Sequence, residues 1–200
     1  MEENCTFDLI KLNTPEQSYL HSFLNFIPLR NLIRKGLFSE RKDLEESMAI
    51  LHGIKSYFMG GFQDSLIDAN NINTTVYIYG DGLTPKTGAI LKYFTSWRVV
   101  SFLNGNNEFK NIHKENNSFV NYLGDPTLYK LTNLYKIIII KMNASLRLEK
   151  ILEKVNCPEI YVIELAYSDG QTYSKRTYDM CNLDTKILSP KKYVKIWYHV

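Results

Sequence analysis

The chain has 200 residues, of which 44% are hydrophobic and 22% charged, and this composition is typical of a globular protein. Its net charge of +3 is too small to indicate nucleic-acid binding by itself. The three widely spaced cysteines have neither CxxC nor metal-ligand spacing, so we expect reduced thiols and no metal site. The longest apolar run, Ile137–Ile140, is far too short to span a membrane. The acidic start, Met1-Glu2-Glu3, lacks the basic residues of a secretory leader, and we expect an intracellular protein, cytoplasmic by default.

The first third of the chain is predicted to be helical. Thr14 and Pro15 provide a capping residue and a proline for the first helical turn, and Pro28 ends or kinks that helix. Ser39 is expected to cap a second helix, whose apolar residues recur at helical spacing: Leu44, Met48, Leu51, Ile54 and Phe58. We interpret residues 1–72 as an N-terminal arm and helical cap.

From residue 73 onward, strand and helix patterns alternate. Four buried strands are predicted, at Val76–Tyr79, Arg98–Leu103, Tyr135–Ile140 and Ile160–Leu165. The unbroken β-branched run in the third of these is typical of a parallel sheet covered on both faces. Two further strands, Leu183–Leu188 and Tyr193–His199, are separated by a short polar segment and predict a hairpin. Residues 73–200 are therefore interpreted as an α/β core that forms one compact unit with the cap.

The most informative stretch is Thr75–Trp97, where a strand, a glycine-containing turn and a helix follow one another. Gly80, Asp81 and Gly82 form the predicted turn, and Thr84 opens the helix. In α/β proteins such a helix start directs free N–H groups at nucleotide-like ligands. The plainer interpretation is that a β-to-α turn needs glycine for its backbone conformation, whether or not it binds a ligand.

The order of elements resembles that of the class I S-adenosylmethionine-dependent methyltransferases. Two N-terminal helices precede a β-α-β unit with a glycine turn, further β/α units and a final hairpin, and the family's seven-stranded sheet also ends in an antiparallel hairpin. The resemblance extends roughly from Leu44 to Val200 and rests on element order and one loop. It implies an α/β fold: a three-layer, Rossmann-like methyltransferase-type sheet with N-terminal helices.

The resemblance also implies S-adenosylmethionine as the cofactor, bound by Gly80, Asp81, Gly82 and Thr84. The family usually has an acidic residue at the end of the first strand and then Gly-x-Gly-x-Gly. Here the acid lies within the turn, and only two glycines are present. The family commonly ends its second strand with Asp or Glu, which accepts hydrogen bonds from the ribose hydroxyls. Asn104 takes this place here, without the strength of a charge-assisted hydrogen bond.

Candidates for substrate binding follow the later strands. Lys141 and Asn143 come after Tyr135–Ile140, and Asp169 follows Ile160–Leu165, at the edge where ligands bind in such sheets. Asn143 as a helix cap and Asp169 as a turn residue are the alternative interpretations. Neither the Asn/Asp-Pro-Pro-aromatic motif of amino-methyltransferases nor the Lys-Asp-Lys-Glu set of ribose methyltransferases can be assigned, so no catalytic residue is predicted.

Basic residues cluster near the C-terminus and alternate with Tyr193, Trp197 and Tyr198. They are candidates for phosphate contacts with a nucleic acid: Lys175, Arg176, Lys186, Lys191, Lys192 and Lys195. The alternative interpretation is an ordinary strand with charged residues on its solvent side and aromatic residues inside.

Two functional hypotheses stand side by side. The first is a methyltransferase-like enzyme with an unidentified substrate. The second is a catalytically inactive methyltransferase-fold module that binds a protein or a nucleic acid, and the departures in the glycine loop and at Asn104 favour it. A dinucleotide-binding oxidoreductase is disfavoured, because it needs the same missing acid and does not explain the terminal hairpin.

Overall fold

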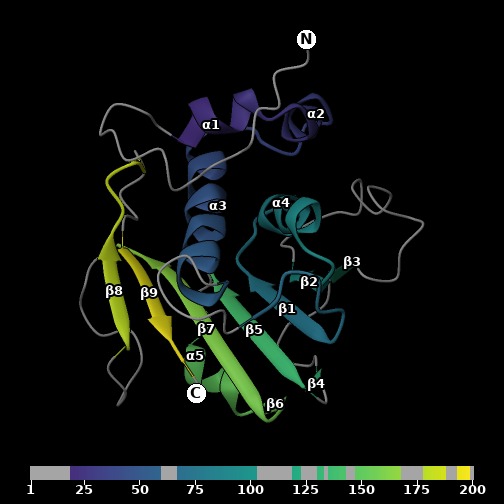
Figure 1. Cartoon of the computed structure of the whole chain (residues 1–200), viewed down its shortest axis with the longest axis vertical. Helices are drawn as coiled ribbons and strands as arrows, with labels where there is room; N and C mark the ends of the chain where they lie inside the picture. The colour runs from purple at the N-terminus through teal and green to yellow at the C-terminus, as the bar shows by residue number, and fades with distance from the viewer. Residues whose placement is uncertain are drawn as a thin grey trace.

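Buried runs of β-branched and aromatic residues form a seven-stranded sheet in the order β3-β2-β1-β5-β7-β9-β8 (Figure 1). The computed structural model describes residues 19–59, 67–102, 119–122, 130–132, 135–142, 147–167, 178–187 and 193–198. The strands of the sheet are β1 (Thr74–Tyr79), β2 (Arg98–Phe102), β3 (Phe119–Tyr122), β5 (Lys136–Lys141), β7 (Glu159–Ala166), β8 (Met180–Leu183) and β9 (Tyr193–Trp197). Two short strands, β4 (Leu131–Thr132) and β6 (Val155–Asn156), pair separately.

The sheet is parallel except at one end. The strands from β3 to β7 are parallel neighbours, whereas β9 runs antiparallel to β7 on one side and to β8 on the other. A strand that enters a sheet antiparallel to its predecessor in the chain can follow it through a short connection, without a crossover helix. This arrangement confirms the predicted Rossmann-like methyltransferase-type sheet that ends in an antiparallel hairpin.

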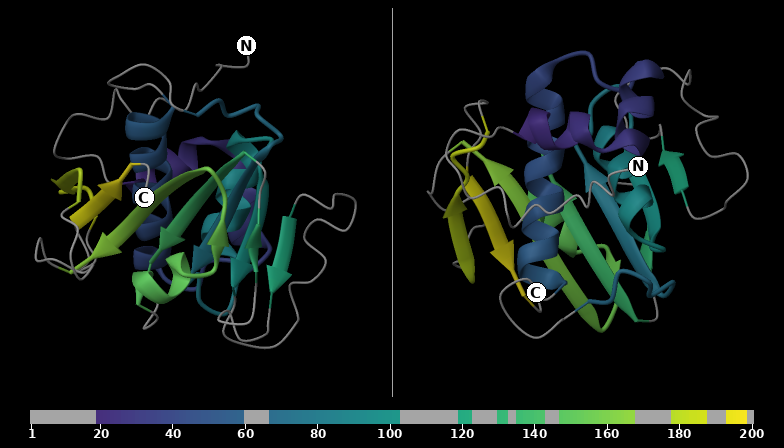
Figure 2. Two further views of the ribbon diagram at one scale, coloured as in Figure 1. Left: turned by 90° about the horizontal axis from the view of Figure 1, so that it is seen from below. Right: turned by 45° about the horizontal axis from the view of Figure 1, so that its top comes forward.

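Helices cover both faces of the sheet. The described helices are α1 (Tyr19–Asn25), α2 (Ile27–Arg34), α3 (Arg41–Gly53), α4 (Lys86–Phe94) and α5 (Leu148–Leu152), and a π-helical turn, η1 (Ile54–Phe58), extends α3. The helices α3 and α4 pack on one face, and α5 lies on the other (Figure 2), so the core has three layers. None of these described helices is long and apolar enough to cross a membrane. The predicted helix start at Thr14 and Pro15 lies outside the described residues.

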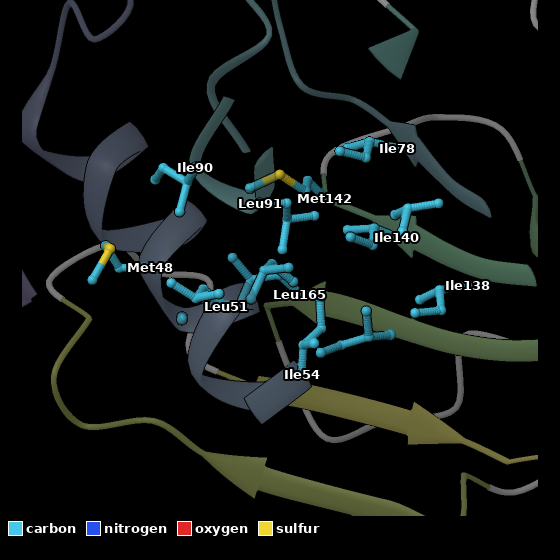
Figure 3. Close-up of a cluster of buried hydrophobic side chains, with 14 of the residues drawn as sticks. Met48, Leu51, Ile54, Ile78, Ile90, Leu91, Ile138, Ile140, Met142 and Leu165 are labelled. Atoms are coloured by element: carbon cyan, nitrogen blue, oxygen red, sulfur yellow. The ribbon is translucent and has the colours of Figure 1, made fainter. Parts of the chain in front are cut away.

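The larger hydrophobic core lies between the helices and the sheet (Figure 3). Helix α3 contributes Met48 and Leu51, and η1 contributes Ile54, all at helical spacing. They meet side chains of α4 and of alternate strand positions: Ile78, Ile90, Leu91, Ile138, Ile140 and Leu165. Burying one such side chain stabilises the fold by about 1.5–3 kcal/mol. The intervening strand residues form a second core on the opposite face, which explains why the strands are apolar without alternation.

The helical cap differs in two details from its prediction. The first helix ends at Asn25, and Pro28 lies in the first turn of α2, where a missing N–H removes no intrahelical hydrogen bond. Ser39 is not the cap of α3. Glu40 occupies the N-cap position without a side-chain cap bond, and Ser39 Oγ instead donates to Oδ2 of Asp43 at 3.4 Å.

The first strand of the C-terminal hairpin is shifted from its prediction. Strand β8 spans Met180–Leu183 and not Leu183–Leu188. Asp184 ends the strand, because its Oδ1 accepts a hydrogen bond from the Lys186 N–H at 3.0 Å. Such a side-chain-to-backbone bond two residues ahead is typical of a turn.

Asp184 also fixes the first helix to this end of the sheet. The hydroxyl of Tyr19, a fully buried residue of α1, donates a hydrogen bond to Oδ2 of Asp184. Burial, together with the neighbouring carboxylate, raises the pKa of Tyr19 above its ordinary value. The contact therefore joins the helical cap to the C-terminal hairpin across 165 positions of sequence.

Replacing Tyr19 with phenylalanine is expected to lower the free energy of unfolding by about 1–3 kcal/mol, because the buried carboxylate of Asp184 loses a donor. In a domain of this size Tm falls by about 2–4 °C for each kcal/mol. Chemical and thermal denaturation measure both quantities. The control is Tyr93→Phe on the exposed side of α4, for which we expect a change within about 0.5 kcal/mol. Equal losses in the two variants would contradict a stabilising role of the Tyr19 hydroxyl.

Candidate functional site

The carboxyl ends of β1 and β5 mark the point where the chain changes sides of the sheet. Tyr79 ends β1 and is the register partner of Lys141 at the end of β5. The helix that follows β1 is α4 on one face, and the helix that follows β5 is α5 on the other (Figure 2). Ligands of open α/β sheets bind in the crevice beyond such a pair of strand ends. The candidate site is therefore built from the β1–α4 turn and the residues around Lys141.

Two glycines determine the shape of the β1–α4 turn. Gly80 has a φ of 82° and Gly82 a φ of 85°, both in the left-handed region that favours glycine. A Cβ atom on Gly82 would meet only Lys86 Nζ within 4 Å, at 3.6 Å, so the backbone conformation and not a lack of space requires this glycine. Both glycines are half-buried and the following Leu83 is exposed, so the outer side of the turn is accessible to solvent.

Asp81 points inward from the same turn and is almost completely buried. Its Oδ1 accepts a hydrogen bond from the Thr87 N–H at 2.8 Å. Its Oδ2 accepts hydrogen bonds from the Gly88 N–H at 3.2 Å and from the Ser101 hydroxyl at 2.7 Å. Burial raises the pKa of Asp81 above its ordinary value, against the lowering effect of these hydrogen bonds. One carboxyl group thus joins the turn, the start of α4 and strand β2.

The first turn of α4 is consequently satisfied from within the protein. The helix begins at Lys86, so Thr87 and Gly88 carry two of the N–H groups that have no intrahelical acceptor. Groups of this kind bind phosphate at helix N-termini in nucleotide-binding proteins. Here the carboxyl group of Asp81 occupies them, and a pyrophosphate would have to displace it. The geometry therefore disfavours the dinucleotide-binding interpretation.

Thr84, the fourth predicted residue of the turn, contacts the helical cap. Its hydroxyl donates a hydrogen bond to the carbonyl of Leu37, between α2 and α3, at 2.7 Å. Lys86, two residues later, forms an ion pair with Asp43 in the first turn of α3. Both side chains of this pair are mostly buried. The turn is therefore fixed to the cap as well as to β2.

A row of charged side chains crosses the sheet at its carboxyl edge. Lys141 of β5, Glu164 of β7 and Lys195 of β9 are successive register partners. They face away from α3 and α4, because the residues beside them in each strand belong to the larger hydrophobic core, which packs against these two helices. Lys141 Nζ lies 2.5 Å from Glu164 Oε1. Lys195 is fully buried, and its Nζ lies 5.7 Å from the centre of the Tyr178 ring.

The burial of Lys195 removes this one residue from the predicted nucleic-acid face. Its neighbours Val194 and Ile196 belong to the larger core beneath α3 and α4, so the Lys195 side chain points to the opposite face of the sheet. It is fully buried there and cannot contact the phosphates of a nucleic acid. Lys186 is half-buried, with Nζ 5.8 Å from the centre of the Tyr19 ring. The other basic candidates lie outside the described residues: Lys175, Arg176, Lys191 and Lys192.

Of the other predicted site residues, some lie within the described part of the chain and some lie outside it. The structure brings four of them together in the β1–α4 turn, beside the strand end that carries Lys141: Gly80, Asp81, Gly82 and Thr84. Three lie outside the described residues: Asn104, Asn143 and Asp169. Within the ranges that the structure describes, no three His, Cys, Asp or Glu side chains lie close enough together to hold a metal ion.

Two residues of the site are missing from the sequence-based candidates. Ser101 donates to Asp81 from a neighbouring strand, and no sequence pattern connects the two. Glu164, in contrast, belongs to a recognisable pattern. Lys136–Lys141 and Glu159–Glu164 are buried runs of equal length with opposite charges at their ends. On neighbouring parallel strands this spacing predicts the observed register.

No protein-family model and no curated protein matches the sequence. Among solved structures, the 16S rRNA methylase RmtB is similar over 78% of this chain, with 10% identity and a TM-score of 0.47. A mutant of MtNAS is similar over 90%, with 13% identity and a TM-score of 0.45. Coclaurine N-methyltransferase is similar over 65%, with 16% identity and a TM-score of 0.40. This chain spans 65%, 76% and 40% of those three chains, respectively, and the likenesses concern the fold alone.

Proposed function

We propose that this chain is an S-adenosylmethionine-dependent methyltransferase, with the cofactor held at the Gly80–Gly82 turn. The observation that carries the proposal is the carboxyl group of Asp81, which takes the N–H groups of Thr87 and Gly88 at the mouth of α4. The turn then offers accessible glycine backbone without a phosphate site. S-adenosylmethionine suits such a turn, because it is a nucleoside ligand that carries a sulfonium group and no phosphate.

The candidate residues have distinct roles in this proposal. Gly80 and Gly82 allow the ligand to approach the backbone closely, because neither carries a side chain. Asp81 braces the turn from inside and does not itself contact the ligand. Asn104, beyond the end of β2, is proposed to accept a hydrogen bond from a ribose hydroxyl.

The substrate is proposed to bind on the other side of the strand ends. When bound, S-adenosylmethionine supplies an activated methyl group for transfer to a nucleophilic atom. Lys141, held by Glu164, is proposed to bind an electronegative group of the substrate next to that atom. Asn143 and Asp169 are proposed to orient the substrate from the segments after β5 and β7. The main contribution of the protein is then to align the nucleophile with the methyl group.

Calorimetric titration of the purified full chain tests this proposal. S-adenosylmethionine and S-adenosylhomocysteine are the probes, and they are also the ligands named for MtNAS and coclaurine N-methyltransferase, respectively. We expect Gly82→Ala to weaken binding by about tenfold or more, because it strains the turn that faces the ligand. Gly36→Ala is the matched control, since Gly36 also has a positive φ, of 73°, and has open space around it. Each substitution should cost about 1 kcal/mol of stability.

Two results would contradict the proposal. No heat from either probe at millimolar concentration would remove cofactor binding, and the inactive binding module would then be the better hypothesis. An equal loss of affinity in Gly82→Ala and Gly36→Ala would assign the effect to backbone strain in general and not to the β1–α4 turn.

A further inference from the structure

We propose that the helical cap carries the docking surface for a nucleic-acid substrate; this proposal rests on the methyltransferase function above for the reaction that the substrate undergoes. Five exposed basic side chains lie between the middle of α2 and the start of α3: Arg30, Arg34, Lys35, Arg41 and Lys42. We call this set the basic cap surface. Over the same stretch, Glu40 is the one exposed acidic residue.

The basic cap surface keeps most of its positive charge. Within the described residues, neither Arg34 nor Lys35 forms an ion pair. Lys42 pairs with Glu40 at 3.0 Å, but both side chains are more than half exposed, and pairs of this kind are weak. Arg41 Nε lies 2.7 Å from Oε1 of Glu45, while almost half of the arginine side chain stays exposed. From Arg30 to Lys42 the exposed side chains thus carry five positive charges and one negative charge, although the whole chain has a net charge of only +3.

This surface adjoins the candidate site. Leu37, in the loop between α2 and α3, accepts the hydrogen bond from the Thr84 hydroxyl of the β1–α4 turn. Asp43, which follows Lys42, pairs with Lys86 at the start of α4. Helix α2 lies above α4 in Figure 1. A polyanion bound along α2 and the start of α3 would therefore pass beside the turn that is proposed to hold the cofactor.

The chemistry of the surface favours a phosphate backbone over a lipid surface. Three of the five cations are arginines, whose planar guanidinium groups bind phosphate with two parallel hydrogen bonds. Arg30 and Arg34 are one helical turn apart, about 6 Å along the axis, and lie on the same side of α2. Every exposed position from 30 to 42 is polar or glycine, and Leu29 and Leu32 are buried. No exposed apolar side chain in this stretch is available for insertion into a bilayer.

Fluorescence anisotropy with the full chain, without S-adenosylmethionine, tests this surface. The probes are a labelled RNA hairpin and a labelled DNA duplex, at about 50–200 mM salt. We expect the triple variant Arg34→Gln, Lys35→Gln, Lys42→Gln to bind the preferred probe about tenfold more weakly or worse. The slope of log K against log salt should become less steep by about 2, because up to three phosphate contacts are lost. Arg41 is left intact because it pairs with the buried Glu45.

A second triple variant separates the local surface from the overall charge. Arg147→Gln, Lys150→Gln and Lys154→Gln remove the same charge from exposed positions in and around α5, on the opposite face of the sheet. We expect this variant to bind nucleic acid within about twofold of the unmodified chain. Equal losses in both variants, no binding of either probe, or tighter binding to vesicles of anionic lipid would each overturn the proposal.

The outcome is distinguishable from that of the cofactor titration. Nucleic-acid binding that depends on the basic cap surface, in a chain that binds no S-adenosylmethionine, would support this surface and contradict the methyltransferase function. Cofactor binding that depends on Gly82, in a chain that binds neither nucleic acid, would support the function and overturn this surface.

Discussion

Replacing Glu164 with alanine is expected to lower the free energy of unfolding by about 3–5 kcal/mol. Glu164 forms an ion pair with Lys141 and is the register partner of Lys195 on its other side, so the substitution leaves the Lys141 ammonium without its carboxylate. The side chains of Lys141 and Glu164 are only 13% and 6% exposed, and Lys195 is fully buried, so water compensates little for the loss. Tm should fall by about 6–20 °C at 2–4 °C for each kcal/mol. Urea denaturation and differential scanning fluorimetry measure these changes.

The same two strands provide the matched control. Lys136 and Glu159 are register partners at the other end of β5 and β7, with Nζ and Oε2 3.0 Å apart. The side chain of Glu159 is 44% exposed, so we expect Glu159→Ala to cost only about 0–1 kcal/mol. Glu164→Gln, which keeps a hydrogen-bond acceptor, should fall between the two alanine variants. Equal costs for Glu164→Ala and Glu159→Ala would contradict the conclusion that burial makes the Lys141 pair strong.

Most of the sheet could be predicted because its central strands are buried on both faces. Such strands contain unbroken apolar runs, as in Ile137–Ile140 of β5, and this pattern is visible in the sequence without knowledge of the neighbouring strands. The edge strand β3 is not among the predicted strands, because its sequence, Phe119–Tyr122, lies at the end of an Asn-rich stretch without periodicity. Its strand conformation depends on pairing with β2, a tertiary contact that local propensity does not contain. The shift of β8 has a local cause instead, since Asp184 ends the strand through a side-chain-to-backbone hydrogen bond two residues ahead.

The site could be located from sequence, but the roles of its residues could not. The strand, the two glycines and the following helix predicted the β1–α4 turn and its place at the carboxyl edge. Whether Asp81 faces a ligand or the interior depends on Ser101, which only the folded sheet brings next to it. The charged residues at the ends of β5 and β7 have the same spacing, which predicts that Lys141 lies next to Glu164 once the two strands are known to be parallel neighbours. Residues that act through register are thus predictable once the strand order is known.

Replacing Asp81 with alanine should destabilise the fold by about 3 kcal/mol or more, because three donors lose a buried acceptor. Asp81→Asn keeps one oxygen but places an amide nitrogen against these donors, and we expect a loss of about 1–3 kcal/mol. Ser101→Ala removes one donor and leaves the bonds from Thr87 and Gly88, so its cost should be about 1 kcal/mol. Equal costs for Ser101→Ala and Asp81→Ala, measured by urea denaturation, would contradict a role of Asp81 in bracing α4.

The pH dependence of stability separates the two forms of the Asp81 carboxyl group. Burial raises its pKa in the folded protein above the ordinary value of 3.8, so the folded state holds this proton at pH values where the unfolded state has lost it. The contribution of Asp81 to stability is therefore largest below pH 3.8 and decreases as the pH rises toward the folded value. Asparagine does not titrate, so the stability difference between the unmodified chain and Asp81→Asn isolates this group. We expect that difference to shrink from acidic to neutral pH. A difference that grows toward neutral pH would mean that the three hydrogen bonds to the carboxylate outweigh its burial.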